Sequence, residues 1–259
     1  MCGIYGILQL DGAAPPLGAL RPMARLTVHR GPDDEGAYVD GPLAFGMRRL
    51  SIIDVAGGHQ PLSNEDGTLS LVANGEIYNY QTLRSELTAQ GHHFRTASDC
   101  ETIVHLYEQH GDAFVERLNG MFAFALWDSR RQRLLLGRDR LGIKPLYLWN
   151  DGQRLVFASE AKAILALPGM NAELDPAALS SYLELGYVPA PQSIFRGIRK
   201  LPPATVLSAE RGKVAERCYW QVPSEVDRAP SEDEWIARVR SRLEESVRMQ
   251  MVSDVPIGA

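Results

Sequence analysis

The chain has 259 residues and a formal net charge of -5 at pH 7, with 45% hydrophobic and 23% charged residues. This is the composition of an ordinary globular protein, long enough to bury a sizeable core. The acidic balance argues against a nucleic-acid binder that relies on neutralising phosphates, and no apolar run is long enough to cross a bilayer. With three cysteines and no Cys-x-x-Cys pair, we expect a soluble, cytoplasmic protein without a disulfide framework.

The first feature along the chain is a cysteine at the second position. If Met1 is removed, Cys2 carries a thiol and a free α-amine on one residue. An α-amine has an ordinary pKa of about 7.7–8.0, so a fraction of it is neutral at physiological pH and can accept the thiol proton. The pattern therefore makes Cys2 a candidate nucleophile, and the buried strand expected at 4–7 would anchor it. The simpler alternative is that Cys2 is a small apolar filler.

A short helix is expected where apolar residues recur at helical spacing in 20–26. The following segment, 29–36, is rich in glycine, proline and charge, which predicts an irregular loop. Within it, Arg30 is expected to pair with Asp33 or Asp34 rather than to contact a substrate.

An extended run at 43–54 alternates so that Arg49 emerges at the end of a buried row. An arginine in that place either binds an anion through its planar guanidinium or pairs with a structural carboxylate such as Asp54. Spacing alone leaves both interpretations open. His59, in the flexible loop that follows, is interpreted as solvated rather than catalytic.

The segment Leu71–Ala73 predicts a buried strand that stops at Asn74-Gly75-Glu76. Asn74 offers a side-chain amide donor and Gly75 an unobstructed backbone N–H, which together would form an oxyanion hole. The alternative is an Asn-Gly hairpin turn. It fits less well because the residues after Glu76 lead into a helix ending at Gly91, with no return strand.

The residues Ser98 and Glu101 have the spacing of a capping box, which predicts a helix that begins here and runs to about Gly111. Asp99 would then lie in the first helical turn. Its carboxylate could bind a substrate ammonium or serve only to stabilise the helix end.

The remaining histidines give no pattern of metal ligands. His92, His93 and His110 lack ligand spacing, and Cys100 and His105 are interpreted as core or surface residues. We therefore predict no metal site.

The second half of the chain is rich in β-strand signals separated by turns too short for helical crossovers. Strands are expected at 121–127, 134–138, 146–149 and 155–158, and helices at 160–167 and 175–186. This order predicts an α+β protein of stacked antiparallel sheets with helices on the outside.

Toward the C-terminus the proline-rich segment 188–203 suggests a domain boundary, and two short strands follow near Thr205 and Lys213. A helix begins at Ser231 and carries one apolar face, and a buried strand is expected to start at 254–259. We assign residues 1–210 to a first domain and 211–259 to a linker and the start of a second.

Together, these motifs resemble the glutaminase domain, a class II glutamine amidotransferase domain, of glutamine-dependent asparagine synthetases. The combination is far more specific than any one motif, and it covers almost the whole chain. The stretches that carry the resemblance are Met1-Cys2-Gly3-Ile4, His29-Arg30-Gly31-Pro32-Asp33, Arg49-Leu50-Ser51-Ile52-Ile53-Asp54, Gly58-His59-Gln60-Pro61, Asn74-Gly75-Glu76-Ile77-Tyr78-Asn79 and Ser98-Asp99-Cys100-Glu101.

The resemblance implies an N-terminal-nucleophile hydrolase with an αββα sandwich, in which Cys2 attacks glutamine and forms a glutamyl thioester. It implies catalytic roles for Cys2, Asn74 and Gly75. By the same resemblance Arg49 binds the substrate α-carboxylate, and Glu76 and Asp99 bind its α-ammonium. The full set of glutamine-binding residues that it implies is Arg49, Leu50, Ile52, Asn74, Gly75, Glu76 and Asp99.

In the family, ammonia passes to a C-terminal synthetase domain in the same chain, which uses ATP and magnesium to make asparagine from aspartate. The present sequence ends before that domain's Ser-Gly-Gly-x-Asp-Ser motif. Glutamine hydrolysis uses only groups between Cys2 and Asp99 and is therefore expected to need no cofactor. Glutamine and the synthetase domain are the expected partners, with a homodimer left open. Two alternatives also stay open: amidation of another carboxylate, such as a cell-envelope sugar or secondary metabolite, and a non-catalytic binding module that retains Met1.

Overall fold

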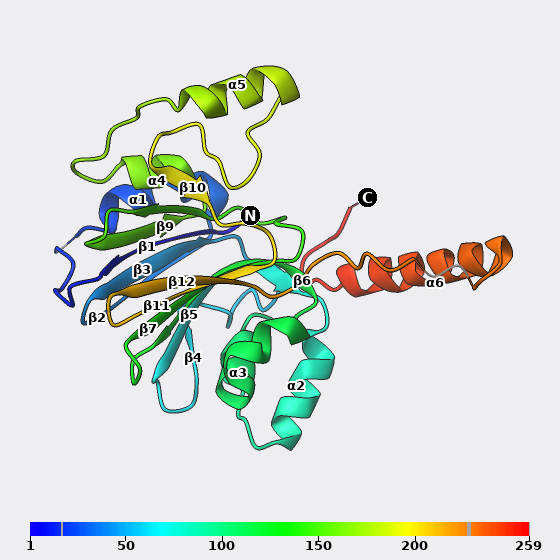
Figure 1. The fold of residues 1–259 in the computed structure, drawn as a ribbon. Coiled ribbons are helices and arrows are strands. Elements are labelled where there is room, and N and C mark those ends of the chain that lie inside the picture. The colour runs from blue at the N-terminus through cyan, green and yellow to red at the C-terminus, as the bar shows by residue number, and fades with distance from the viewer. Residues whose placement is uncertain (17, 227–228, 259) are drawn as a thin grey trace.

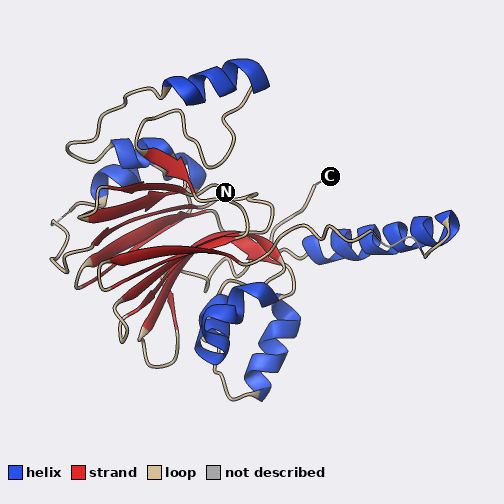
Figure 2. Cartoon of the chain, viewed as in Figure 1, coloured by secondary structure: helices blue, strands red, loops and turns tan. Residues whose placement is uncertain are grey.

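The computed structural model describes residues 1–16, 18–226 and 229–258. Two six-stranded sheets lie face to face, and helices cover their outer faces (Figure 1, Figure 2). The strand pairings within both sheets are antiparallel. The predicted α+β class, with stacked antiparallel sheets inside and helices outside, is confirmed.

The first sheet has the strand order β10-β8-β9-β1-β3-β2, so the N-terminal strand lies inside it. Its members are β1 (Gly3–Gln9), β2 (Asp34–Asp40), β3 (Leu43–Arg49), β8 (Tyr147–Asn150), β9 (Arg154–Ala158) and β10 (Ile198–Lys200). The irregular loop predicted at 29–36 is partly wrong, because β2 already begins at Asp34. Pairing of β2 with β3 stabilises that strand, and local composition cannot show such a partner.

The second sheet has the order β12-β11-β7-β6-β5-β4. It contains β4 (Leu62–Ser63), β5 (Leu69–Ile77), β6 (Gly120–Asp128), β7 (Arg133–Arg138), β11 (Thr205–Glu210) and β12 (Lys213–Cys218). Strand β5 does not stop at Asn74 as predicted but pairs with β6 through Ile77. Gly75 permits this pairing, because a Cβ there would lie 2.2 Å from the carbonyl oxygen of Met121.

The helices are α1 (Arg21–Leu26), α2 (Tyr80–Ala89), α3 (Glu101–His110), α4 (Ala161–Leu165), α5 (Pro176–Leu185) and α6 (Glu232–Gln250), with 3-10 turns at Val28–Arg30 and Gly111–Arg117. The capping box predicted for α3 is wrong. Ser98 does not cap this helix, and Glu101 instead accepts hydrogen bonds from the backbone N–H groups of Arg95 (2.7 Å) and Thr96 (2.8 Å). Asp99 consequently lies before the helix and not in its first turn.

Three apolar clusters join the layers. Phe45, Trp127 and Phe157 are fully buried between the two sheets. Ile103 belongs to the cluster that packs α2 and α3 on the second sheet, and Met23 to the cluster that packs α1 and α4 on the first. Burying each such side chain stabilises the fold by about 1.5–3 kcal/mol.

The C-terminal helix α6 begins with the capping box that the sequence predicts, formed by Ser231 and Glu234. It projects from the sandwich in Figure 1, and its apolar side chains Trp235, Val239, Leu243 and Val247 are exposed. The strand predicted at 254–259 is not formed at 254–258, and its last residue lies outside the described residues. The segment instead contacts the loop between β3 and β4. There the N–H of Asp254 donates to the carbonyl oxygen of Ile52 (3.0 Å).

The predicted boundary at 210 falls in the turn between β11 and β12, and β12 still belongs to the second sheet. No helix in the described part of the chain has an apolar stretch of the length that a membrane span requires.

Candidate active site

Cys2 stands immediately before β1, at the point where the central strand of the first sheet begins. Its carbonyl oxygen accepts a hydrogen bond from Nε of Arg30 (2.8 Å), and the next strand residue, Ile4, donates its N–H to Oγ of Ser159 (3.0 Å). These contacts fix the backbone on both sides of Gly3. The thiol therefore projects from a rigid position, as the predicted anchoring strand requires.

The structure corrects the interpretation of Arg30. Its Nη1 pairs with Oε1 of Glu160 at 3.0 Å, and not with Asp33 or Asp34. Burial alone would raise the pKa of Glu160, but hydrogen bonds from Arg30, His29 and Lys162 lower it to about 2. The buried Arg30 thus joins Glu160 to the backbone of Cys2 and positions that residue.

The Cys2 thiol lies against the backbone of Leu50. The N–H of Leu50 donates to Sγ (3.4 Å), and Sγ donates to the Leu50 carbonyl oxygen at 3.6 Å. Burial raises the pKa of the Cys2 thiol, although the Leu50 N–H lowers it in part. The chain carries Met1, and burial lowers the pKa of the Met1 amine. A thiol in these surroundings needs a nearby base to become a thiolate.

A cleft with about 500 Å³ of open space, part of it continuous with solvent, brings the predicted residues together. Its walls come from β3, β5, the loop before α3, and the N-terminus. The lining residues are Met1, Cys2, Arg49, Leu50, Ile52, Ile53, Gln60, Ala73, Asn74, Gly75, Glu76, Ser98, Asp99, Cys100 and Lys144. Every residue of the predicted site lines this one cleft.

Two hydrogen-bond donors of β5 at this cleft have no partner among the described residues. Asn74 is buried, and its Nδ2 has no hydrogen-bond partner in the described part of the chain. Phe122, opposite Gly75 on β6, directs its backbone N–H and carbonyl to Asp139. In an antiparallel ladder this makes Gly75 and Phe122 a non-hydrogen-bonded pair, so the Gly75 N–H faces away from β6.

The two neighbouring positions on that open edge of β5 are occupied. The N–H of Ala73 donates to Oε1 of Gln60 (2.7 Å), and the N–H of Ile77 donates to Oδ2 of Asp99 (2.7 Å). The Gly75 N–H lies between them on the same edge. An Asn74 amide and a Gly75 N–H at one cleft are the arrangement that an oxyanion hole requires.

Arg49 is buried, and three backbone carbonyls hold its guanidinium. Nη2 donates to the carbonyl oxygens of Ile53 (2.9 Å) and Asp54 (2.7 Å), and Nη1 donates to Val55 (3.4 Å). The carboxylate of Asp54 is used elsewhere, by the N–H groups of Gly57 and Ala97. Arg49 is thus a buried cation at the cleft. No carboxylate of the described residues lies within ion-pair distance of it, so its charge is available to bind an anion.

Two carboxylates face the same cleft. Burial raises the pKa of Asp99 to about 6, although hydrogen bonds from the backbone of Ile77 and Cys100 oppose the shift. Burial also raises the pKa of Glu76, and nearby Lys144 partly offsets the effect. A bound cation would lower the pKa of both carboxyl groups, because it would favour their charged forms.

Lys144 and Gln60 line the cleft but were not singled out from the sequence. Lys144 is buried, and burial lowers its pKa while Glu76 raises it. The charged, glycine-containing stretch 138–144 is the only local signal that could have indicated Lys144. Gln60 belongs to the Gly58-His59-Gln60-Pro61 motif, but its role in holding β5 depends on a contact that local spacing cannot show.

The two stacked antiparallel sheets and their outer helices have a counterpart among solved structures. The solved structure of glutamine phosphoribosylpyrophosphate amidotransferase from B. subtilis, complexed with ADP and GMP, matches 91% of this chain and 52% of its own, with a TM-score of 0.57 and 21% sequence identity. Residues 1–220 match the family described as glutamine amidotransferase domain, and the chain belongs to that family.

Curated relatives extend the likeness to the rest of the chain. Asparagine synthetase [glutamine-hydrolyzing] 3 of Bacillus subtilis (strain 168) is 39% identical over 263 residues, which cover 99% of this chain and 42% of that protein. Asparagine synthetase B [glutamine-hydrolyzing] of Escherichia coli (strain K12) is 37% identical over 264 residues, which cover 100% of this chain and 42% of that protein. The chain therefore spans less than half the length of these relatives, and its resemblance to their glutamine amidotransferase domain is confirmed.

Proposed function

We propose that this chain hydrolyses glutamine to glutamate and ammonia. The thiolate of Cys2 attacks the side-chain amide carbon of glutamine, and the carbonyl oxygen becomes an oxyanion. When the C–N bond breaks, the nitrogen takes up a proton and leaves as ammonia, and a glutamyl thioester remains on Cys2. Water then attacks the thioester carbon, which releases glutamate and restores the thiol.

The observation that carries this proposal is the pair of unused donors beside Cys2 in one cleft. Asn74 Nδ2 is buried without a partner among the described residues, and the Gly75 N–H faces the open edge of β5. Leaving a buried donor unsatisfied destabilises a fold by about 1–3 kcal/mol. Such a cost is explained if an oxyanion supplies the missing acceptor during the reaction, whereas a filler role for Cys2 leaves it unexplained.

The same cleft has groups for both ends of an amino acid. Arg49 would bind the α-carboxylate, and Glu76 and Asp99 would bind the α-ammonium, while Leu50 and Ile52 form part of the wall. A site with buried groups for both charges discriminates strongly against amides that lack them.

We further propose that the whole protein uses this ammonia to make asparagine from aspartate in a synthetase domain of the same chain. The names of the curated relatives support this, since each is a glutamine-hydrolyzing asparagine synthetase. ATP and magnesium would then bind the synthetase domain, and glutamine hydrolysis would need no cofactor. In this division the glutaminase domain comprises the predicted residues 1–210 together with β12, which completes the second sheet, and a linker and the start of the synthetase domain follow.

The test is glutamate release from glutamine by the purified chain, with and without ATP and aspartate. We expect release that does not depend on either addition and that Cys2→Ala abolishes. Cys218→Ala is the matched control, because Cys218 is an exposed free cysteine on the edge strand β12. Release that survives in Cys2→Ala would refute the nucleophile assignment.

The mechanism also predicts that Met1 is absent from the active protein. Only a free α-amine on Cys2 can take the thiol proton, because an amide nitrogen is not basic. Intact-mass measurement of a homogeneous, active preparation gives the answer. Full activity in protein that retains Met1 would require another base.

A further inference from the structure

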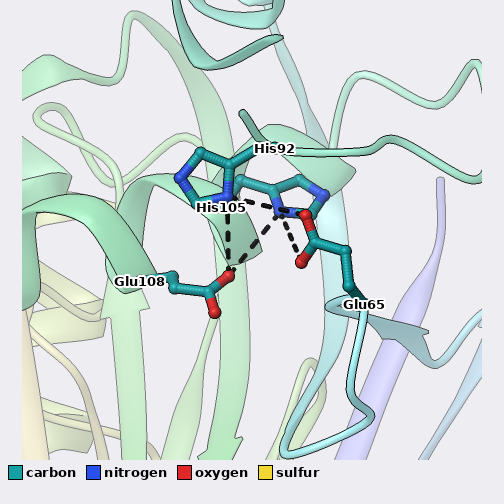
Figure 3. Close-up of side chains that lie close together, drawn as sticks. All are labelled: Glu65, His92, His105 and Glu108. Atoms are coloured by element: carbon teal, nitrogen blue, oxygen red, sulfur yellow. Dashed lines mark ion pairs between the residues drawn. The ribbon is translucent and has the colours of Figure 1, made fainter. Parts of the chain in front are cut away.

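A cluster of two imidazoles and two carboxylates lies where α3 meets the β4–β5 turn and the α2–α3 connection, apart from the cleft. Glu65 comes from the turn between β4 and β5, and His92 from the connection between α2 and α3. His105 and Glu108 stand one turn apart on α3. Figure 3 shows the four side chains turned toward one another, and one ligand atom from each lies within 4.8 Å of the others.

The contacts inside the cluster are too long for hydrogen bonds. Nδ1 of His92 lies 3.6 Å from Oε2 of Glu108 and 3.7 Å from Oε1 of Glu65. Nδ1 of His105 lies 3.6 Å from Oε2 of Glu65 and 3.9 Å from Oε2 of Glu108. The four groups therefore surround a common point without bonding directly to one another.

These spacings are close to those of a tetrahedral zinc centre. Bonds of about 2.0–2.2 Å to nitrogen and oxygen place neighbouring ligands ~3.3–3.6 Å apart. The three separations that involve Oε2 of Glu65 or Glu108 would have to shorten by only a few tenths of an ångström, and all four ligand atoms lie within 4.8 Å of one another. Two imidazoles and two carboxylates are also among the ligand types that zinc binds in proteins.

In Glu65, Glu108 and His92 the second polar atom is held by a neighbour, which leaves the first atom for the centre. Oε1 of Glu65 accepts the N–H of His93 (2.7 Å). Oε1 of Glu108 accepts from Nδ2 of Asn64 (3.3 Å), and Nε2 of His92 lies at 3.2 Å from Oε1 of Gln109.

His105 has only a longer contact of this kind. Its Nε2 faces Oε1 of Glu101 at 3.5 Å, a direction that favours the proton on Nε2 and leaves Nδ1 free to bind a metal. The His105 side chain is fully buried, and neither of its ring nitrogens has a hydrogen-bond partner in the described part of the chain. Burial of an unpartnered imidazole is unfavourable. A ligand for Nδ1 at the centre of the cluster would therefore stabilise His105.

We propose that Glu65, His92, His105 and Glu108 bind one Zn²⁺ ion. This departs from the sequence expectation of no metal site. The ion would tie together the β4–β5 turn, the α2–α3 connection and α3, and would hold the segment that leads from His92 to Asp99 at the cleft. Partial exposure of Glu65 and Glu108, at 31% and 36% of their side chains, leaves a path for the ion to enter. The role assigned to the ion is structural.

The test is zinc binding by the chelator-stripped chain, followed by gel filtration and elemental analysis. We expect one equivalent of zinc, and a visible absorption spectrum of tetrahedral cobalt when Co²⁺ is added instead. Saturating zinc should raise Tm by about 5 °C or more. A wild-type chain that retains no zinc and gives no tetrahedral cobalt spectrum would overturn the proposal.

Variants locate the ion. His92→Ala and Glu108→Gln alter partly exposed side chains, so they should fold even if His105→Ala does not. Each should weaken zinc binding by at least the ~10–100-fold that follows loss of an outer partner of a metal ligand. His93→Ala is the matched control, because only the backbone of His93 contacts the cluster. Equal zinc affinity in His92→Ala and His93→Ala would place the ion elsewhere and refute the site.

Discussion

The cleft at Cys2 and the cluster on α3 both contain a buried polar group without a partner among the described residues, and they differ in the charges around it. At the cleft the unpartnered atom is a donor, Asn74 Nδ2, and both a guanidinium and carboxylates stand nearby. In the cluster it is an imidazole, His105, surrounded by two carboxylates and a second imidazole. The first set suits a ligand with charges of both signs, and the second suits a cation. The character of the unused groups thus indicates the class of ligand.

The largest effect should come from removing the unused donor of the cleft. Asn74→Ala is expected to lower kcat about 10²–10³-fold, because the donor acts mainly on the oxyanion and not on bound glutamine. KM should change much less. Asn150→Ala, at the exposed end of β8, is the control and should leave kcat unchanged. If Asn74→Ala changed only KM, the donor would act in substrate binding and not on the oxyanion.

The next effect concerns the buried cation of the cleft. Arg49→Lys should raise the KM for glutamine about 10–100-fold, since an ammonium cannot copy the planar guanidinium that the three carbonyls hold. Arg48→Lys is a matched control on the same strand, because Arg48 pairs with Glu35 (2.6 Å) and does not line the cleft. An unchanged KM in Arg49→Lys would remove Arg49 from the substrate site.

A third prediction uses the pKa of Asp99, which burial raises to about 6. The carboxylate binds the substrate ammonium only when ionised, so kcat/KM should fall as pH drops below about 6, approaching tenfold per pH unit. Above that pH the carboxylate is charged and this dependence disappears. Asp99→Asn should have low kcat/KM at every pH and lack this limb. A wild-type profile that stays flat down to pH 4 would contradict the assignment.

Local signals predicted much of this molecule. The helix α5 begins with Asp175 as its N-cap and ends at Gly186 in the left-handed region, as a capping residue and a terminal glycine indicate. The cleft residues were also predicted, because short motifs carry them and because the motifs resemble a known family. Their roles in binding and catalysis remain predictions.

What the sequence could not predict depends on contacts between distant segments. Arg30 pairs with Glu160, although Asp33 and Asp34 are nearer in sequence. Strand β5 extends past Asn74 only because β6 pairs with it. The cluster on α3 combines three segments, so no spacing within one of them shows that its side chains meet.

The smallest effect should be that of a cluster substitution on catalysis at the cleft. None of the four cluster residues lines the cleft, and the segment from His92 to Asp99 connects them through backbone. At 25 °C, kcat/KM of metal-free His92→Ala should therefore stay within about twofold of the metal-free wild type, as expected for independent sites.

Added zinc should slow heat inactivation of the wild type and of His93→Ala, and not that of His92→Ala, because only an intact cluster can use the ion to stabilise α3. Initial rates and residual activity after heating measure the two effects separately. A large loss of kcat/KM in metal-free His92→Ala would show that the cluster orders the cleft even without an ion, and the two regions would then act as one.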